Sequence, residues 1–551
     1  MIVRAPHMLG YDNLNLVTSI FVEQRGAGTP DEVQSGTFAM VYPLFIRAGA
    51  IDHTRVQLAP ILERLRNCPP LTFQDDLRLP STKLLILRHE LSITIIHILV
   101  RLCPGFSGHA SSPALQHCPI RPLLDGHRTQ CCYLCVLDIE EASRAGNLKL
   151  QDHIYLIDCE MTPEELSDHA ILVAGNGLTC SRVRSGKDVR KRELNAWACR
   201  DIFQITIGLF HMGLNLIWAL LCVHRGTLSE GASLTSLFVL LEKTRLGSPH
   251  PNYHTLLAAL MQILDGLVLE AWRKVLRCTS LADFALQDPT ADDLILLATQ
   301  ILNECATPAP GQPVDGHSPA NDKVHYNTHL LIHDLLYVSS FLSGVSDGDF
   351  GHVELLYPHL AIMFRRAGGT NYASKIMHHI LYLEHIWTPD YAYASELCYH
   401  QAMGVNLNAE HHICALKTLI GDKGATSDWE HIGNASACID IIEHMKTEAG
   451  AMLGSEYAGT THTTPEAVKD MSWRVAMKAR EEGWLDFTPG RVGNQVVSAQ
   501  TNILSEAAMK EGRTVDDAMF EVEELPMMDI GHESDDGGDM EDDEELPGED
   551  M

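Results

Sequence analysis

Cysteine and histidine, two residue types that bind metal ions, are concentrated in one stretch of the chain. Cys132 and Cys135 have the C-x-x-C spacing of a zinc site. The upstream residues that could complete four ligands are Cys103, His109, His117, Cys118, His127 and Cys131. Their spacings fit no standard zinc finger, and Tyr133, Leu134 and Val136 give the segment the character of a buried strand. Zinc binding and a buried strand both stay open, and the strand is the simpler interpretation.

Two aspartates flank a glycine in the segment Asp347-Gly348-Asp349. A turn of this kind can bind a cation through side-chain and backbone oxygens. The segment lacks the full ligand spacing of a calcium loop. A turn between two helices is therefore the alternative to a metal site at Asp347 and Asp349.

A dense group of basic residues follows the turn-like segment Gly175–Thr179. Its members are Arg182, Arg184, Lys187, Arg190, Lys191 and Arg192. Such a group could contact the phosphates of a nucleic acid. Asp188 and Glu193 dilute the positive charge, and no aromatic residue is interleaved for base stacking. A solvated helix face is the alternative.

The charge of the chain is unevenly distributed. The 551 residues carry a formal net charge of -31, and residues 515–551 contain nine Asp and eight Glu with no Lys or Arg. The remaining residues therefore carry a mild charge of -14. We expect the tail from residue 511 to be disordered, because it has too little apolar material to form a core. It either binds basic partners or only increases solubility.

Apolar runs predict a small α/β part followed by many helices. The predicted strands are Leu14–Val22, Phe38–Ile46, His153–Asp158 and Ala170–Gly175, and the predicted helices are Leu84–Cys103, Leu256–Leu276, Asp292–Glu304 and Pro465–Glu482. Phe203–Val223 has no formal charge and is long enough to span a bilayer. Because it contains Gln204, His211 and Asn215, we interpret it as a strand followed by a buried helix, and we expect no membrane span.

The cysteine content and the opening residues bear on the cellular compartment of the protein. Fifteen cysteines in a chain of this length do not form a disulfide scaffold. The opening residues MIVRAPHMLGYDN do not combine a basic segment with an apolar one, so we expect no secretory signal. The sequence predicts an intracellular protein of the nucleus or cytoplasm.

Six short segments between residues 8 and 450 resemble, in the same order, the motifs of one family. They are Tyr11-Asp12-Asn13; Leu137-Asp138-Ile139 with Gly146-Asn147; Gly175–Thr179 with Arg182 and Arg184; Gly208–Met212 with Asn215; Asp347–Gly351 with Phe364 and Asn371–Ala373; and Asn406, Glu410-His411 and Lys417. The family is DUF6589, a fungal domain of unknown function that looks transposon-associated. That association implies RNase H-like nuclease ancestry.

The resemblance implies a domain plan. We expect a mainly α protein with a small α/β core, with a divergent RNase H-like sheet and large helical additions as the sharper hypothesis. The predicted parts are an α/β core at 1–210 with a loop insertion at 104–130, helices at 211–304, a linker at 305–322, helices at 323–510 and the disordered acidic tail at 511–551.

The family motifs also suggest a scattered catalytic triad. Two-metal phosphoryl transfer needs about three carboxylates around two Mg²⁺ ions. The motif positions are Asp12, residue 176 and Glu410, with Asp12 and Glu410 as metal ligands. Residue 176 is Asn176 where the family has Asp. Because an amide is a weaker, neutral ligand, the resemblance implies an impaired site. The alternative is that Asp12 caps a turn, Asn176-Gly177 forms a tight turn and Glu410 is an acidic residue near a helix N-terminus.

Two functions follow from these observations. The first is a degenerate, transposon-derived nuclease-like protein with little or no catalysis, which would bind nucleic acid and Mg²⁺. The second is a non-enzymatic protein that binds other proteins, basic ones included, through its helical surface and acidic tail.

Overall fold

The computed structural model describes most of the chain between residues 4 and 491. The described residues are 4–18, 32–46, 49–50, 53–248, 250–307, 322–399, 405–421, 429–453 and 464–491. The predicted acidic tail at 511–551 and most of the predicted linker at 305–322 lie outside them. The division of the chain into domains therefore stays a prediction.

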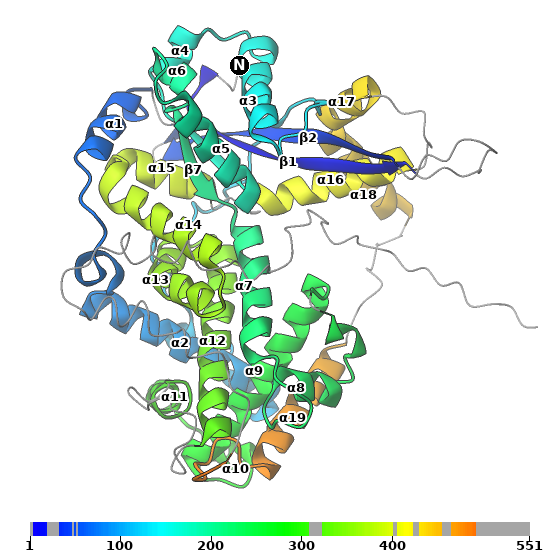
Figure 1. The fold of residues 1–551 in the computed structure, drawn as a ribbon. Helices are drawn as coiled ribbons and strands as arrows, with labels where there is room; N and C mark the ends of the chain where they lie inside the picture. Colours follow the sequence, from blue (N-terminus) through cyan, green and yellow to red (C-terminus); the bar gives the residue numbers. More distant parts are fainter. Residues whose placement is uncertain are drawn as a thin grey trace, which may run out of the picture.

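A mixed five-stranded sheet forms the upper part of the molecule in Figure 1. Its strands are β1 (His7–Thr18), β2 (Glu32–Pro43), β5 (Cys132–Tyr133), β6 (Ile171–Gly175) and β7 (Phe203–Ile207), and a separate short pair is formed by β3 (Phe45–Ile46) and β4 (Gly49–Ala50). The order across the sheet is β5-β2-β1-β6-β7. β2 runs antiparallel to β1 and β5, whereas β6 is parallel to β1 and β7 is parallel to β6.

Helices make up most of the structure, as the sequence predicts. They are α1 (Leu58–Arg66), α2 (Ser81–Leu102), α3 (Arg144–Asp152), α4 (Pro163–Ser167), α5 (Gly177–Arg190), α6 (Ala196–Cys199), α7 (Leu209–His224), α8 (Leu234–Leu240), α9 (Tyr253–Leu276), α10 (Leu281–Ala285), α11 (Ala291–Cys305), α12 (Lys323–Ser346), α13 (Phe350–Arg366), α14 (Thr370–Leu381), α15 (Pro389–Tyr399), α16 (Val405–Gly421), α17 (Trp429–Ala437), α18 (Ile439–Leu453) and α19 (Pro465–Glu481). α7 leads from the sheet into the helical body, where it packs on α12 and α13 (Figure 1).

Helices cover both faces of the sheet. The Tyr11 hydroxyl in β1 donates a hydrogen bond to Asn147 of α3, whereas the preceding residue, Gly10, lies against Val405 of α16. Successive residues of a strand point to opposite faces. α3, with α5 beside it, therefore lies on one face and α16 on the other (Figure 1).

Most of the predicted elements are confirmed. The helices predicted at Leu84–Cys103, Leu256–Leu276, Asp292–Glu304 and Pro465–Glu482 are α2, α9, α11 and α19. Ala170–Gly175 contains β6, whose five residues are all buried, as in a parallel strand covered on both faces. Phe203–Val223 is the predicted strand followed by a helix, β7 and α7.

Two strand predictions were wrong in type or position. His153–Asp158 is a π-helical turn that continues α3, because a buried apolar run of six residues fits a helix end as well as a strand. β1 begins at His7, seven residues before the predicted start at Leu14; the predicted residues 14–18 are in the strand, and residues 19–22 lie outside the described part of the chain. Gly10, Asp12 and Asn13 interrupt its apolar pattern and mimic a turn.

Among the described residues one helix, α9, is long and apolar enough to cross a membrane. In its most apolar window of 18 residues, 78% is buried inside the protein. This burial is typical of the core helix of a globular protein.

Candidate functional site

Polar residues gather where the parallel strands β6 and β7 end, beside the middle of β1. Gly10 of β1 pairs with Ala174 of β6. Asp12 and Asn176, each two positions further along, therefore lie side by side. β7 ends next to β6, and α7 begins directly after it, which places His211 in the first turn of α7. This edge is where open α/β sheets bind their ligands.

A fourth residue, from much later in the chain, also reaches this edge. α16 lies on the face of β1 that Gly10 and Asp12 share, and it carries Glu410. A Cβ atom at Gly10 would lie 3.0 Å from the Cγ1 atom of Val405, in the first turn of α16. Because glycine has no side chain, α16 can approach β1 closely enough for Glu410 to face Asp12.

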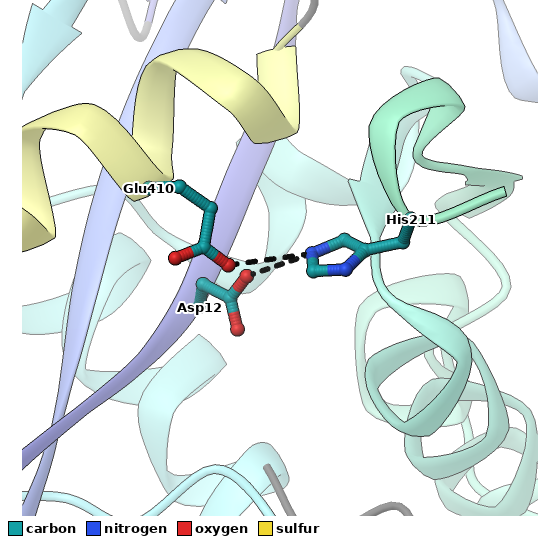
Figure 2. A group of neighbouring side chains, drawn as sticks. All are labelled: Asp12, His211 and Glu410. Carbon is teal, nitrogen blue, oxygen red and sulfur yellow. Dashed lines mark hydrogen bonds and ion pairs between the residues drawn. The ribbon is translucent and has the colours of Figure 1, made fainter. Parts of the chain in front are cut away.

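Asp12, His211 and Glu410 point toward one another (Figure 2). The Nε2 atom of His211 lies 3.3 Å from Oδ2 of Asp12 and 3.7 Å from Oε1 of Glu410. One ligand atom from each of the three residues lies within 4.8 Å of the others. In the part of the chain that the structure describes, this is the only group of three or more His, Cys, Asp or Glu residues arranged to hold a metal ion.

Burial differs among the three side chains. Asp12 is 5% exposed, His211 13% and Glu410 30%. The group is thus anchored in the core at Asp12 and reaches solvent at Glu410. Two carboxylates this close repel each other unless a cation lies between them. Either a metal ion or a protonated imidazole could supply that positive charge.

Asn176 has both ends of its amide engaged. Its Oδ1 atom accepts a hydrogen bond from the backbone N–H of Thr179 at 2.8 Å, which caps α5, and its Nδ2 atom donates to Oδ1 of Asp12 at 3.1 Å. The two partners fix the orientation of the amide, since a flipped amide would put nitrogen against N–H and oxygen against carboxylate. Asn176 therefore offers Asp12 a donor and no ligand oxygen.

The hydrogen bonds of Asp12 divide its carboxylate into two ends. Oδ1 accepts from the Asn13 backbone N–H at 2.9 Å as well as from Asn176. Oδ2 faces His211. Asn176 and the Asn13 backbone thus orient the carboxylate so that one oxygen points toward His211 and Glu410.

A buried polar cluster behind the site fixes the start of α5. Glu141 is fully buried, and its carboxylate accepts from the Thr179 hydroxyl at 2.8 Å and from Asn147 at 3.0 Å. Burial, with the nearby Glu141 carboxylate, raises the pKa of Tyr11 well above its usual range. Thr179 is therefore held by Glu141 and capped by Asn176. Nothing in the sequence pattern singled out Glu141.

The Asp347-Gly348-Asp349 segment is a turn between two helices. Asp347 is exposed at the end of α12, and Asp349 caps α13. The Asp349 carboxylate also accepts hydrogen bonds from the backbone N–H groups of Ile120 at 2.7 Å and Arg121 at 2.8 Å. Its oxygens hold the loop at 104–130 in place, so the geometry lends no support to the predicted cation.

Cys132 and Cys135 lie apart from the sheet-edge site. Cys132 is in β5, as the strand interpretation predicts, and Cys135 is exposed. Neither belongs to a metal-binding group of three among the described residues. Zinc at this pair stays a prediction without geometric support.

The basic group lies on and just beyond α5. Arg182 is half-buried, and its Nε atom donates to the carbonyl of Ala142 at 2.6 Å. Arg184 and Arg190 are half-buried, and Lys191 and Arg192 are exposed beyond the end of the helix. Part of the group thus stabilises the fold, and nucleic-acid binding by the rest stays a prediction.

The sequence therefore suggested three of the four residues at this site. His211 had no assigned role, although it belongs to the Gly208–Met212 motif. The available signal was its position, because a side chain in the first helical turn after a parallel strand points over the ligand-binding edge.

Comparison with known proteins supports the family assignment. No curated protein and no solved structure matches the chain. A family model described as a family of unknown function, DUF6589, matches residues 66–462. The match includes Asn176, His211 and Glu410 but begins after Asp12, whose place in the site rests on the geometry. Because the matched segment covers well over half of the sequence, the chain belongs to the DUF6589 family.

Proposed function

We propose that this chain is a nuclease-like protein whose RNase H-like site is degenerate, with little or no catalysis. The order of the sheet supports this proposal. Numbered along the chain, its strands are arranged 3-2-1-4-5, and the second strand alone runs antiparallel to the others. RNase H-like nucleases share this arrangement.

One observation carries the proposal. Asp12 in the first strand, Asn176 after the fourth strand and Glu410 on a helix across the first strand meet at one point, although the chain separates them by hundreds of residues. A capping role would explain Asn176, but it would not bring Glu410 to Asp12. A shared site explains all three positions together.

The site does not fit two metal ions. A pair of Mg²⁺ ions would activate water and stabilise the charge of a phosphoryl group, and it needs carboxylate oxygens shared between the ions. At the middle position Asn176 presents an N–H group to Asp12 and uses its oxygen to cap α5. This mismatch is the reason to expect little catalysis.

Restoring the carboxylate tests the proposal. Asn176→Asp should keep the cap on α5, since aspartate caps helices as well as asparagine does. We expect Mg²⁺-dependent DNA cleavage by Asn176→Asp, and none by the wild-type protein beyond the background of Asp12→Asn. Circular dichroism should show that all three proteins are folded.

Two outcomes would contradict the proposal. Wild-type protein as active as Asn176→Asp would mean that the site is not degenerate. A folded Asn176→Asp variant that cleaves no better than the double variant Asp12→Asn/Asn176→Asp would remove the nuclease-like reading and favour a non-enzymatic interaction protein.

A further inference from the structure

We infer that Asp12, His211 and Glu410 bind one divalent cation of the kind that accepts imidazole, represented by Zn²⁺, in place of a Mg²⁺ pair. This inference concerns the same site as the proposed function, but it does not require that the site cleave nucleic acid. Its ligand atoms would be Oδ2 of Asp12, Nε2 of His211 and Oε1 of Glu410.

The spacing of these atoms suits a single ion. Zinc binds nitrogen and carboxylate oxygen at about 2.0–2.2 Å, so two ligands of a tetrahedral ion lie roughly 3.3–3.6 Å apart. The His211 nitrogen is 3.3 Å from the Asp12 oxygen and 3.7 Å from the Glu410 oxygen. These two pairs need adjustments of only a few tenths of an ångström. The third pair, the Asp12 and Glu410 oxygens, lies within 4.8 Å, and movement of the partly exposed Glu410 side chain would bring it to the spacing of a bound ion.

The ligand types select among cations. Mg²⁺ prefers an octahedral shell of oxygen atoms, whereas imidazole suits Zn²⁺ and its transition-metal neighbours. The His211 imidazole faces both carboxylates, so an ion bound among the three side chains must share its shell with nitrogen. Three protein ligands leave a fourth position for water or substrate, as in catalytic zinc sites.

In a one-ion site, Asn176 would orient the Asp12 carboxylate for the metal ion. Groups that hydrogen-bond to a metal ligand orient it for the ion. Asn176 and the backbone of Asn13 hold Oδ1 of Asp12, which turns Oδ2 toward His211. An aspartate at position 176 would lack the N–H group and would add a third negative charge. Asparagine in place of aspartate at position 176 therefore weakens a two-ion site but suits a one-ion site.

Co²⁺ is a suitable probe, because it binds in zinc sites and its absorption spectrum depends on the number and type of its ligands. We expect the full-length chain, stripped of metal, to develop the visible bands of tetrahedral Co²⁺ without the near-ultraviolet band of a cobalt–thiolate bond. One equivalent of Zn²⁺ should remove these bands, and a large excess of Mg²⁺ should not.

Three variants assign the site. His211→Ala should weaken cobalt affinity by more than the roughly 10–100-fold that loss of a ligand's hydrogen-bond partner costs. Glu410→Gln, at a more exposed position, should weaken it as well and guards against misfolding of the first variant. The double variant Cys132→Ser/Cys135→Ser is the matched control, and its spectrum should equal that of the wild type.

The results separate this inference from the proposed function. The one-ion site is overturned if no tetrahedral cobalt spectrum develops, or if the spectrum is unchanged in both folded variants, His211→Ala and Glu410→Gln. If cobalt binds as described but Asn176→Asp does not cleave DNA, the nuclease-like proposal alone fails. If Asn176→Asp cleaves DNA and cobalt does not require His211, this inference alone fails.

Discussion

Two buried aspartates, one in the helical body and one at the sheet edge, have their negative charge balanced in different ways. Asp334 in α12 is fully buried and forms an ion pair with the Arg366 guanidinium, which donates to its Oδ2 atom. His224 also contacts Oδ2, at 2.7 Å, and His333 lies 3.1 Å from Oδ1. Burial lowers the pKa of His224 well below its usual value and that of His333 to about 3, so both are neutral. Arg366 is the cation that balances Asp334.

Asp12 is nearly as buried but has no such partner. Among the described residues, no lysine or arginine forms an ion pair with it, and a second carboxylate, Glu410, joins its group. Burying a charge without compensation is costly. The helical body therefore balances its aspartate with a permanent cation, whereas no lysine or arginine among the described residues pairs with Asp12 at the sheet edge. That difference distinguishes a structural carboxylate from a candidate binding site.

The largest expected effect is the loss of the permanent cation. Arg366→Met keeps much of the side-chain volume but leaves Asp334 unpaired, and we expect it to lower the free energy of unfolding by about 3–5 kcal/mol. Asp12→Asn removes a charge that no permanent cation balances and should change stability by less than about 1 kcal/mol. Urea unfolding of both variants measures the difference. Equal losses would mean that the two aspartates serve the same structural purpose.

The next effect concerns the contact that brings Glu410 to Asp12. Gly10→Ala places a Cβ atom 3.0 Å from Cγ1 of Val405, so the Val405 side chain must give way by a few tenths of an ångström. We expect this to cost roughly 1–3 kcal/mol and to lower cation affinity. Gly108→Ala is the matched control, since a Cβ atom there meets nothing within 4 Å. Urea unfolding and cobalt titration check both variants. Unchanged cobalt affinity in Gly10→Ala would show that α16 does not need this close approach.

Features of the fold that depend on neighbouring residues could be predicted from the sequence better than features that depend on residues far apart in the chain. The long helices α2, α9 and α11 are visible in their own apolar spacing, and β6 in its continuous apolar run. β1 was misplaced because Gly10 and Asp12, which build the site, break its alternation. Functional positions are where local rules are expected to fail.

The site itself was only partly predictable. Asp12, Asn176 and Glu410 came from the family resemblance, since nothing local links Glu410 to a strand at the start of the chain. His211 was missed because a single histidine in an apolar helix is ambiguous until the sheet order is known. The use of the Asn176 amide as a donor to Asp12 depends on strand register and could not be inferred from residue type.

A further expected effect is a dependence of stability on pH, which arises from buried histidines in both the sheet and the helices. Burial lowers the pKa values of His7 and His359 to about 4. Below about pH 6.5 these histidines bind protons in the unfolded chain but not in the folded one. Stability should therefore fall as the pH drops from about 6.5 toward 4, by up to roughly 2 kcal/mol per histidine at pH 5.

Comparing urea unfolding at pH 7.5 and pH 5 tests this prediction. His7→Gln should lose less stability between the two pH values than the wild type does. His444→Gln, which changes a solvent-exposed histidine on α18, should lose as much as the wild type. An equal loss in all three proteins would contradict the assignment to His7.

The central claim is that the amide of Asn176 limits the sheet edge to one cation. Two metal ions that share carboxylates lie about 3.5–4 Å apart, and at this distance two Mn²⁺ ions give an exchange-coupled electron paramagnetic resonance spectrum. The most direct measurement is that spectrum for Mn²⁺-loaded wild-type protein and for Asn176→Asp. The account predicts uncoupled Mn²⁺ in the wild type and a coupled pair in Asn176→Asp. A coupled pair in the wild type, or none in the folded variant, would contradict it.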